Sequence, residues 1–393
     1  MRSSVVQWLA GIVVTVVISA VPSEAAEWTV DPSPEVGAFS TIWEAVLFAA
    51  PGDVVRVNPG TYCESVEILT SIRLVGSMDG VAEIVPTERF AVKLHGGASG
   101  AVLENLAIRG TSRLSQGVVV SEVNSVTVDG LKIIGCDEGI RIEDASSVAV
   151  RNCSVSGNAN GVVLRNSSDC AIVGNTCTDN VFGIALDHAE GNRIVENALR
   201  GNFEGVSVWT GSTGNTIEGN RAEENATGIS VNAARNRIVG NTLLVNANGI
   251  SLWASTSCWI EGNAAAGNGT GINVSESDEV TMTGNDCSGN EQNGINLHAC
   301  TGCAVEGNVA SGNWSCGIQF GHCEDTAASG NVCEENRYAG MQLWNSTGCD
   351  VLGNRLAANR FAGLILSGFT SGATMEENVV ERNGRHSTVD WTG

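Results

Sequence analysis

Side chains suited to acid–base chemistry occur at matching places in neighbouring segments of the chain. Arg165 and Asp187 each lie four residues after a Gly that precedes an apolar residue, and His188 follows Asp187 directly. An arginine beside a carboxylate and an imidazole can neutralise an acidic substrate group and move a proton, as lyases and epimerases require. Together with Arg141 and Glu143, the same residues could instead form a ladder of surface ion pairs between stacked strands. The ladder is the simpler interpretation, and the catalytic one stays open.

Aromatic and amide side chains form a second set with the same spacing. Tryptophan recurs four residues after such a Gly, at strand positions that face water, where tryptophan is unusual. Amides, which suit sugar hydroxyls, occur two residues after the Gly. The set predicts a carbohydrate-binding surface, and its members are Trp209, Trp253, Asn273, Asn296, His298, Gln319, Gln342 and Trp344. The alternative is that a loop covers the tryptophans or that they pack against neighbouring side chains.

The chain contains 13 cysteines. Cys300 and Cys323 occupy equivalent positions in consecutive repeats, and stacked strands lie about 4.8 Å apart, within the Cα separation that a disulfide tolerates. This spacing allows a disulfide between these two, and we expect buried free thiols at the other positions. A zinc site is the alternative for one group, which comprises Cys300, Cys303, Cys316, His322 and Cys323.

These residues are positioned by a repeat that runs through most of the chain. A Gly followed by an apolar residue recurs twelve times from Gly117 to Gly363, at steps of 21 to 23 residues. After each Gly, apolar and polar residues alternate, which indicates a strand with one buried face. Asparagine pairs frame a further short strand, and we expect them to adopt the left-handed corner conformation and to bond to the stacked Asn. Three strands and three corners per repeat predict an all-β right-handed parallel β-helix.

The two ends of the chain depart from this repeat. Residues 26–116 are expected to form an N-terminal cap and irregular first coils, and residues 117–383 the regular coils. A short helix over residues 41–50 should cover the first coil with Ile42, Val46 and Leu47, because an open β-helix exposes a strand edge. Residues 384–393 should form a C-terminal tail or cap.

Residues 1–25 resemble a secretory signal peptide, with one basic residue, an apolar run and small residues before a cleavage point after Ala25. An uncleaved anchor is the alternative. No other segment approaches the ~20 apolar residues of a membrane span. We therefore expect a secreted, periplasmic or cell-surface protein.

The charge balance limits the partners. The chain has 43 Asp and Glu against 21 Lys and Arg, a net charge of −22. Such a surface repels phosphate backbones, which argues against a nucleic-acid partner. The simpler interpretation is that the acidic surface keeps the protein soluble. The more specific one is that columns of carboxylates bind Ca²⁺. No cofactor follows from the pattern with certainty.

The segment from Phe39 to Ile68 resembles the N-terminal cap and first coil of pectin-lyase-like β-helix proteins. The repeating G-N-x4-N-x2-3-G-I-x-L is similar to the repeat of the NosD-like, periplasmic copper-binding type. This resemblance implies the β-helix fold, which hosts lyases, hydrolases, epimerases, esterases and non-enzymatic binders. The alginate-type epimerase strand Tyr-Gly-x-Asp-Pro-His is not reproduced, since Ala185 replaces its Asp and Asp187 its His. Copper is not favoured either, because the methionines and histidines are scattered.

These observations predict an exported β-helix protein that binds an extracellular or cell-envelope polysaccharide along an exposed parallel sheet. The first alternative is an enzyme that acts on an acidic glycan through Arg165, Asp187 and His188. The second is a structural envelope protein or a NosD-like accessory protein that acts through contacts with an envelope protein partner.

Overall fold

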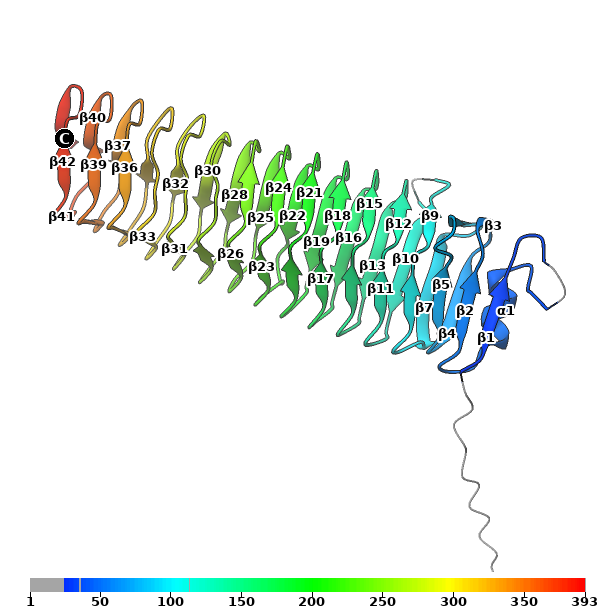
Figure 1. The fold of residues 1–393 in the computed structure, drawn as a ribbon. Helices are drawn as coiled ribbons and strands as arrows, with labels where there is room; N and C mark the ends of the chain where they lie inside the picture. Colours follow the sequence, from blue (N-terminus) through cyan, green and yellow to red (C-terminus); the bar gives the residue numbers. More distant parts are fainter. Residues whose placement is uncertain (1–24, 35–36, 113, 393) are drawn as a thin grey trace, which may run out of the picture.

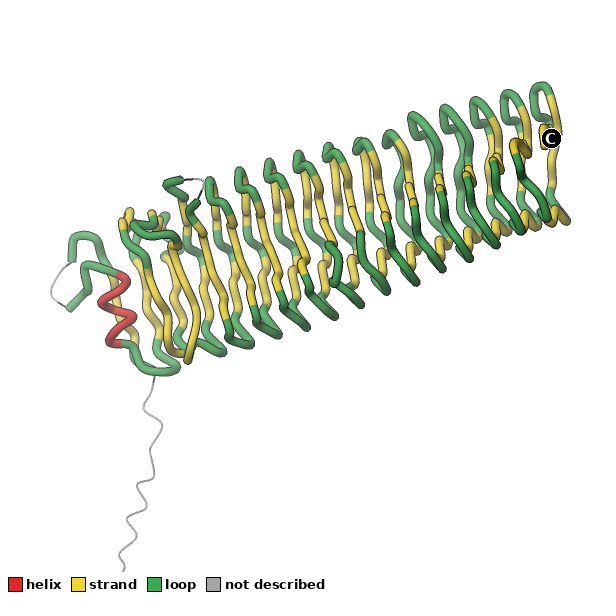
Figure 2. The backbone as a smooth tube through the Cα atoms, turned by 180° about the vertical axis from the view of Figure 1, so that it is seen from behind, coloured by secondary structure: helices red, strands yellow, loops and turns green. Residues whose placement is uncertain are grey.

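The computed structural model describes residues 25–34, 37–112 and 114–392, and nearly all of the predicted signal peptide lies outside this part of the chain. The described residues form a long rod of stacked coils, a right-handed parallel β-helix (Figure 1). Seen from behind, each coil shows strands separated by short corners, with one helix at the N-terminal end (Figure 2). The predicted fold is therefore confirmed.

Parallel sheets run along the rod. The first sheet has 16 strands, from β1 (Glu27–Val30) to β41 (Thr374–Glu376), and a second has 15. The third side has nine strands, from β3 (Gly60–Cys63) to β27 (Thr242–Leu244), and three more from β36 (Val332–Glu334) to β42 (Val379–Glu381). Between these two groups the third side is reduced to isolated bridges, such as the one between Ala264 and Asp286.

The residues of the two predicted sites lie on the 15-stranded sheet, except His188 and Trp209, which directly follow its strands. Its strands, in order along the rod, are β4 (Val66–Thr70), β7 (Phe90–Gly97), β10 (Gln116–Ser121), β13 (Glu138–Glu143), β16 (Asn160–Arg165), β19 (Phe182–Asp187), β22 (Glu204–Val208), β25 (Thr227–Val231), β28 (Asn248–Trp253), β30 (Thr270–Ser275), β32 (Ile295–His298), β34 (Ile318–Gly321), β37 (Ala339–Trp344), β40 (Ala362–Gly368) and β43 (His386–Thr392).

The register of this sheet stacks equivalent residues of successive repeats. Ile184 pairs with Val206, and Leu186 pairs with Val208. All four side chains point inward and are at most 1% exposed, so each coil adds a layer to one continuous apolar core. The repeat Gly precedes this pair where coils approach closely: a Cβ at Gly183 would lie 2.5 Å from the carbonyl oxygen of Gly205.

Asparagine ladders hold two corners of the rod. In the first ladder, the side-chain Oδ1 of Asn220 accepts hydrogen bonds from the backbone N and the Nδ2 of Asn197, and this pattern repeats from coil to coil. The predicted stacking is confirmed. The predicted left-handed conformation is wrong for these asparagines, because the residue before each of them adopts it, as Gly219 does with φ of 63°. That division frees the Asn amide to bond along the rod.

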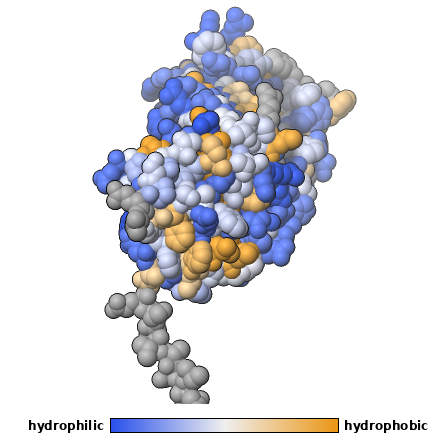
Figure 3. Space-filling model, turned by 90° about the vertical axis from the view of Figure 1, so that its right-hand side faces the viewer, coloured by the Kyte–Doolittle hydropathy of each residue, from blue (hydrophilic) through white to orange (hydrophobic). Residues whose placement is uncertain are grey.

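The N-terminal coil is covered by α1 (Ile42–Phe48), which begins after the N-cap residue Thr41. Ile42 and Val46 are buried as expected, but Leu47 is 66% exposed, so its predicted covering role is wrong. The buried residues Ile42, Ala45 and Val46 share one face of the helix, and Leu47 lies off that face. Apolar side chains gather among polar ones on this end of the rod (Figure 3), where Trp43, Leu47 and other residues line a cavity of about 300 Å³.

Residues 26–116 contain strands β1 to β9 (Ala107–Arg109), which continue the same sheets into the N-terminal part. At the other end, the predicted tail forms β43, which pairs with β40 and extends the 15-stranded sheet by one strand. No helix within the described ranges is long and apolar enough to cross a membrane.

Candidate functional site

The acid–base candidates belong to an ion-pair network on strands β13, β16 and β19. At its centre is Glu138, whose side chain is only 5% exposed. Its carboxylate accepts a hydrogen bond from Gln116 at 2.8 Å and pairs with Arg165 at 2.7 Å and Arg141 at 3.6 Å. Arg141 also pairs with Glu143. Two arginines therefore neutralise carboxylates of the chain itself.

Asp187 and His188 lie at the edge of this network. Arg165 is 3.9 Å from the Asp187 carboxylate, which instead makes a 2.7 Å hydrogen bond with Nδ1 of His188. The His188 side chain is 67% exposed. The structure thus brings the three predicted catalytic residues together, but it directs Arg165 toward Glu138. Sequence reasoning missed Glu138 because it precedes the repeat Gly, at a position that was not counted among the outward ones.

The aromatic and amide candidates follow the outward face of the same sheet in two parallel columns. We call the residues two positions after each repeat Gly the middle column and those four positions after it the outer column. The register pairs the middle column as Ser251, Asn273, Asn296, Gln319 and Gln342. It pairs the outer column as Trp253, Ser275, His298, Gly321 and Trp344.

Exposure of the middle column changes along the rod. Val163, Ala185 and Ser207 are fully buried although they point outward, and Ile365 is buried near the C-terminal end. Between them the middle column is partly exposed in six consecutive coils, at Ser230, Ser251, Asn273, Asn296, Gln319 and Gln342. We call the outward face from β25 to β37 the open stretch.

An aromatic contact closes the face before the open stretch. Phe182 begins β19, whereas Trp209 follows the end of β22, so the two residues lie on opposite sides of the middle column. Their ring centroids nevertheless lie 5.3 Å apart in an edge-to-face arrangement. The rings must therefore cross the middle column, which accounts for the complete burial of Ala185 and Ser207. One edge-to-face contact of Trp209 is therefore made within the protein, to Phe182.

A second aromatic cap closes the face after the open stretch. Tyr338 and Phe361 stack with centroids 5.3 Å apart and ring planes at 7°. They pack against a small apolar cluster, separate from the main core, which consists of Cys316, Ala339, Ala362, Ile365 and Val389. This cluster buries the middle column at Ile365, directly after Gln342 in the register.

The amides of the open stretch bond partly to one another. Asn296 donates to the Oδ1 of Asn273 at 2.8 Å, and Asn293 donates to the Oε1 of Gln319 at 2.7 Å. The Oε1 of Gln342 accepts a longer contact of 3.6 Å from the thiol of Cys316. These contacts orient the side chains and use oxygen atoms as acceptors. Amide NH₂ groups of Asn273, Gln319 and Gln342 are left to donate to a bound molecule.

Aromatic rings occupy part of the outer column within the open stretch. Trp253 is 52% exposed and Trp344 is 39% exposed. His322 lies between His298 and Trp344, with ring centroids 5.2 Å and 4.5 Å away. Gly321 makes this possible, because a Cβ there would lie 3.2 Å from the His298 ring and 3.4 Å from Trp344. His322, which the sequence suggests only as a zinc ligand, belongs to this row because its ring contacts both neighbours.

All thirteen cysteines lie in the described part of the chain and are free, Cys300 and Cys323 included. The structure therefore has two thiols where the spacing allows a disulfide. These thiols occupy a corner where Ser255, Ser277 and Ser346 bond to the backbone of adjacent coils. The Cys300 and Cys323 thiols likewise point to backbone carbonyl oxygens, at 3.4 Å and 3.5 Å.

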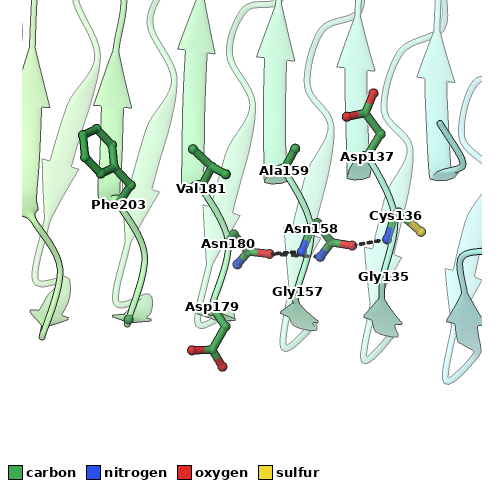
Figure 4. Close-up of a pocket in the computed structure, with 11 residues that line it drawn as sticks. Gly135, Cys136, Asp137, Gly157, Asn158, Ala159, Asp179, Asn180, Val181 and Phe203 are labelled. Carbon is green, nitrogen blue, oxygen red and sulfur yellow. Dashed lines mark hydrogen bonds between the residues drawn. The ribbon is translucent and has the colours of Figure 1, made fainter. Parts of the chain in front are cut away.

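A cavity of about 660 Å³ lies away from the two predicted sites. It follows the corner between the third side and the 15-stranded sheet, from Gly135 to Phe203. Figure 4 shows that the amides of Asn158 and Asn180 are bonded within the ladder. The carboxylates of Asp137 and Asp179 point away from each other in the same view. This groove therefore presents no paired groups for acid–base chemistry.

Metal donors do not converge in the residues that the structure describes. No group of three or more His, Cys, Asp or Glu side chains is arranged there to hold a metal ion. Of the soft donors that copper prefers, Met282 and Met341 are buried in the core, whereas the Met78 side chain is 83% exposed. Cys316 lies in the outer cluster, apart from the core that contains Cys300, Cys303 and Cys323. These residues fit neither the zinc alternative nor a copper centre.

Comparisons with solved structures give two similar proteins, of which the first supports the fold. DFA-IIIase from Arthrobacter chlorophenolicus A6, in complex with DFA-III, has a TM-score of 0.56 and 14% identity, over 82% of this chain and 94% of that one. The A-module of mannuronan C-5 epimerase AlgE6 from Azotobacter vinelandii has a TM-score of 0.42 and 15% identity, over 90% of this chain and 94% of that one. No curated protein sequence matches the chain.

A family model matches residues 91–248 and 235–391 and so spans most of the coils. The matched residues include the ion-pair network, both aromatic caps and the whole open stretch. The chain therefore belongs to the family described as periplasmic copper-binding protein (NosD).

Proposed function

We propose that this protein is exported and binds a polysaccharide along the open stretch. The observation that carries the proposal is the restricted exposure of the middle column. Polar side chains are accessible over six consecutive coils, and an aromatic cap ends the accessible part on each side. Membership in a family described as periplasmic supports the location outside the cytoplasm.

The chemistry of the open stretch suits sugars. Amide donors on the middle column can bond to hydroxyl oxygens, and the exposed rings of Trp253 and Trp344 offer flat apolar surfaces. Consecutive coils are about 4.8 Å apart, which is close to the length of one hexose, so a glycan chain can lie along the rod in step with the coils. Catalysis is not part of the proposal, because Arg165 is already paired with Glu138.

Affinity electrophoresis against a panel of neutral and acidic polysaccharides tests this function. We expect at least one polysaccharide to retard the protein. The double variant Trp253→Ala/Trp344→Ala should lose most of this retardation, since aromatic contacts of this kind contribute about tenfold or more in affinity. Trp259→Ala is the matched control, because Trp259 is 43% exposed but lies on β29 (Trp259–Glu261) of the 16-stranded sheet. Absence of retardation by every polysaccharide, or equal loss in the control, contradicts the proposal.

A further inference from the structure

Charged side chains are unevenly distributed along the outward face of the 15-stranded sheet. Upstream of the open stretch, the face carries Glu138, Arg141, Glu143, Arg165, Asp187 and Glu204. Within the open stretch, six coils contribute three outward positions each, namely the residue before the repeat Gly, the middle column and the outer column. These positions hold Thr, Asn, Ser, Gln, Trp, His, Gly, Cys and Ala, and none holds Asp, Glu, Lys or Arg.

This uncharged surface belongs to a chain whose net charge is −22. In these coils the residue directly after the outer column is once a carboxylate, Glu276, and never a lysine or arginine. Further around the same corners, carboxylates outnumber the one arginine, Arg235, and they are Asp278, Glu279, Glu324 and Asp325. A uronate or sulfated sugar would meet the negative field of the whole protein without an arginine or lysine on the face itself to pair with. The nearest arginines of the face, Arg141 and Arg165, lie beyond the Phe182–Trp209 cap and are paired with Glu138.

We propose that the ligand of the open stretch is a neutral polysaccharide, an inference that rests on the proposed function. Neutral sugar units present hydroxyl groups to the amide NH₂ groups of the middle column and an apolar ring face to Trp253 and Trp344. The register separates these two tryptophans by four coil steps, or about 19 Å. With one sugar unit per coil, a chain of about five units therefore places a unit on each aromatic ring, and shorter ones reach only one ring.

Isothermal titration calorimetry of the purified protein separates this inference from the proposed function. The neutral probes are cello-, xylo-, malto- and manno-oligosaccharides of two to eight units, and the acidic probes are oligogalacturonates and alginate oligomers of the same lengths. We expect one neutral series to bind, with an affinity that rises up to about five units, then levels off, and changes little between low and high salt. Acidic oligomers should bind at least about tenfold more weakly.

The alternative results have distinct meanings. If acidic oligomers bind more tightly than neutral ones and high salt weakens them, the neutral-ligand inference is overturned while polysaccharide binding stands. If neither series binds and no polysaccharide retards the protein, both proposals fail. The variant Gln319→Arg provides an internal check, because a cation on the middle column should raise the affinity for acidic oligomers relative to the parent protein. A gain in the variant requires that the oligomer lies on this face.

Discussion

Replacement of one ladder asparagine should destabilise the whole rod. Asn220 is 1% exposed, and its side chain makes four hydrogen bonds of 2.8 to 3.0 Å: two from Asn197, one to the carbonyl of Ile194 and one to Asn241. Asn220→Ala removes all four and leaves the buried backbone N–H of Asn197 without its partner. The orphaned donor costs about 2 kcal/mol, and the three other bonds contribute about 1 kcal/mol each. We expect the free energy of unfolding to fall by about 4 to 5 kcal/mol.

Urea denaturation followed by circular dichroism measures this loss, and Asn232→Ala is its control. Asn232 is half-buried on the outer column, and within the described residues its side chain makes no hydrogen bond. The control should change the free energy of unfolding by about 0.5 kcal/mol or less. A loss below about 2 kcal/mol in Asn220→Ala, or one equal to that of the control, would refute the reasoning that satisfied ladder bonds stabilise the corners.

Two further predictions concern titratable groups. Twelve of the thirteen cysteines are buried, and burial raises the pKa of thiols such as Cys136, to about 11. A thiol reagent should therefore modify only Cys63 rapidly in the native protein, and all cysteines after unfolding. Rapid modification of several sites in the native protein would contradict this. Hydrogen bonds from Trp28, Ala50 and Ala26 lower the pKa of Asp53, so its contribution to stability is present above about pH 4 and is lost as the pH falls through the lowered value. Asp53→Asn should therefore reduce the dependence of the melting temperature on pH below about 4, and an unchanged dependence would count against this role.

The fold could be predicted from the sequence because each coil repeats one local pattern. Ile184 and Leu186 point inward as the alternation after Gly183 requires, and the same holds for their partners in the next coil. Local periodicity determines these positions, and stacking multiplies the signal. The direction of an outward side chain follows from the same alternation.

The exposure of outward residues could not be predicted in this way. Ala185 and Ser207 occupy outward positions, yet they are buried because Phe182 and Trp209 meet above them from adjacent coils. That contact depends on side-chain rotamers and on the end of β22 at Val208, which a repeat pattern does not encode. The central role of Glu138 was not predicted for a related reason. The long side chain of Arg165, near the end of β16, pairs with Glu138 at the start of the adjacent strand β13.

The number of coils between the two aromatic caps determines the accessible length of the face. The Phe182–Trp209 contact and the Tyr338–Phe361 stack each involve residues of adjacent coils only, and the coils between them share the same backbone register. Insertion or deletion of one whole coil between the caps would change the distance between them by about 4.8 Å and leave both unaltered. The length of the accessible face therefore changes in steps of one coil, and duplication of one repeat within the gene is enough to lengthen it by one step.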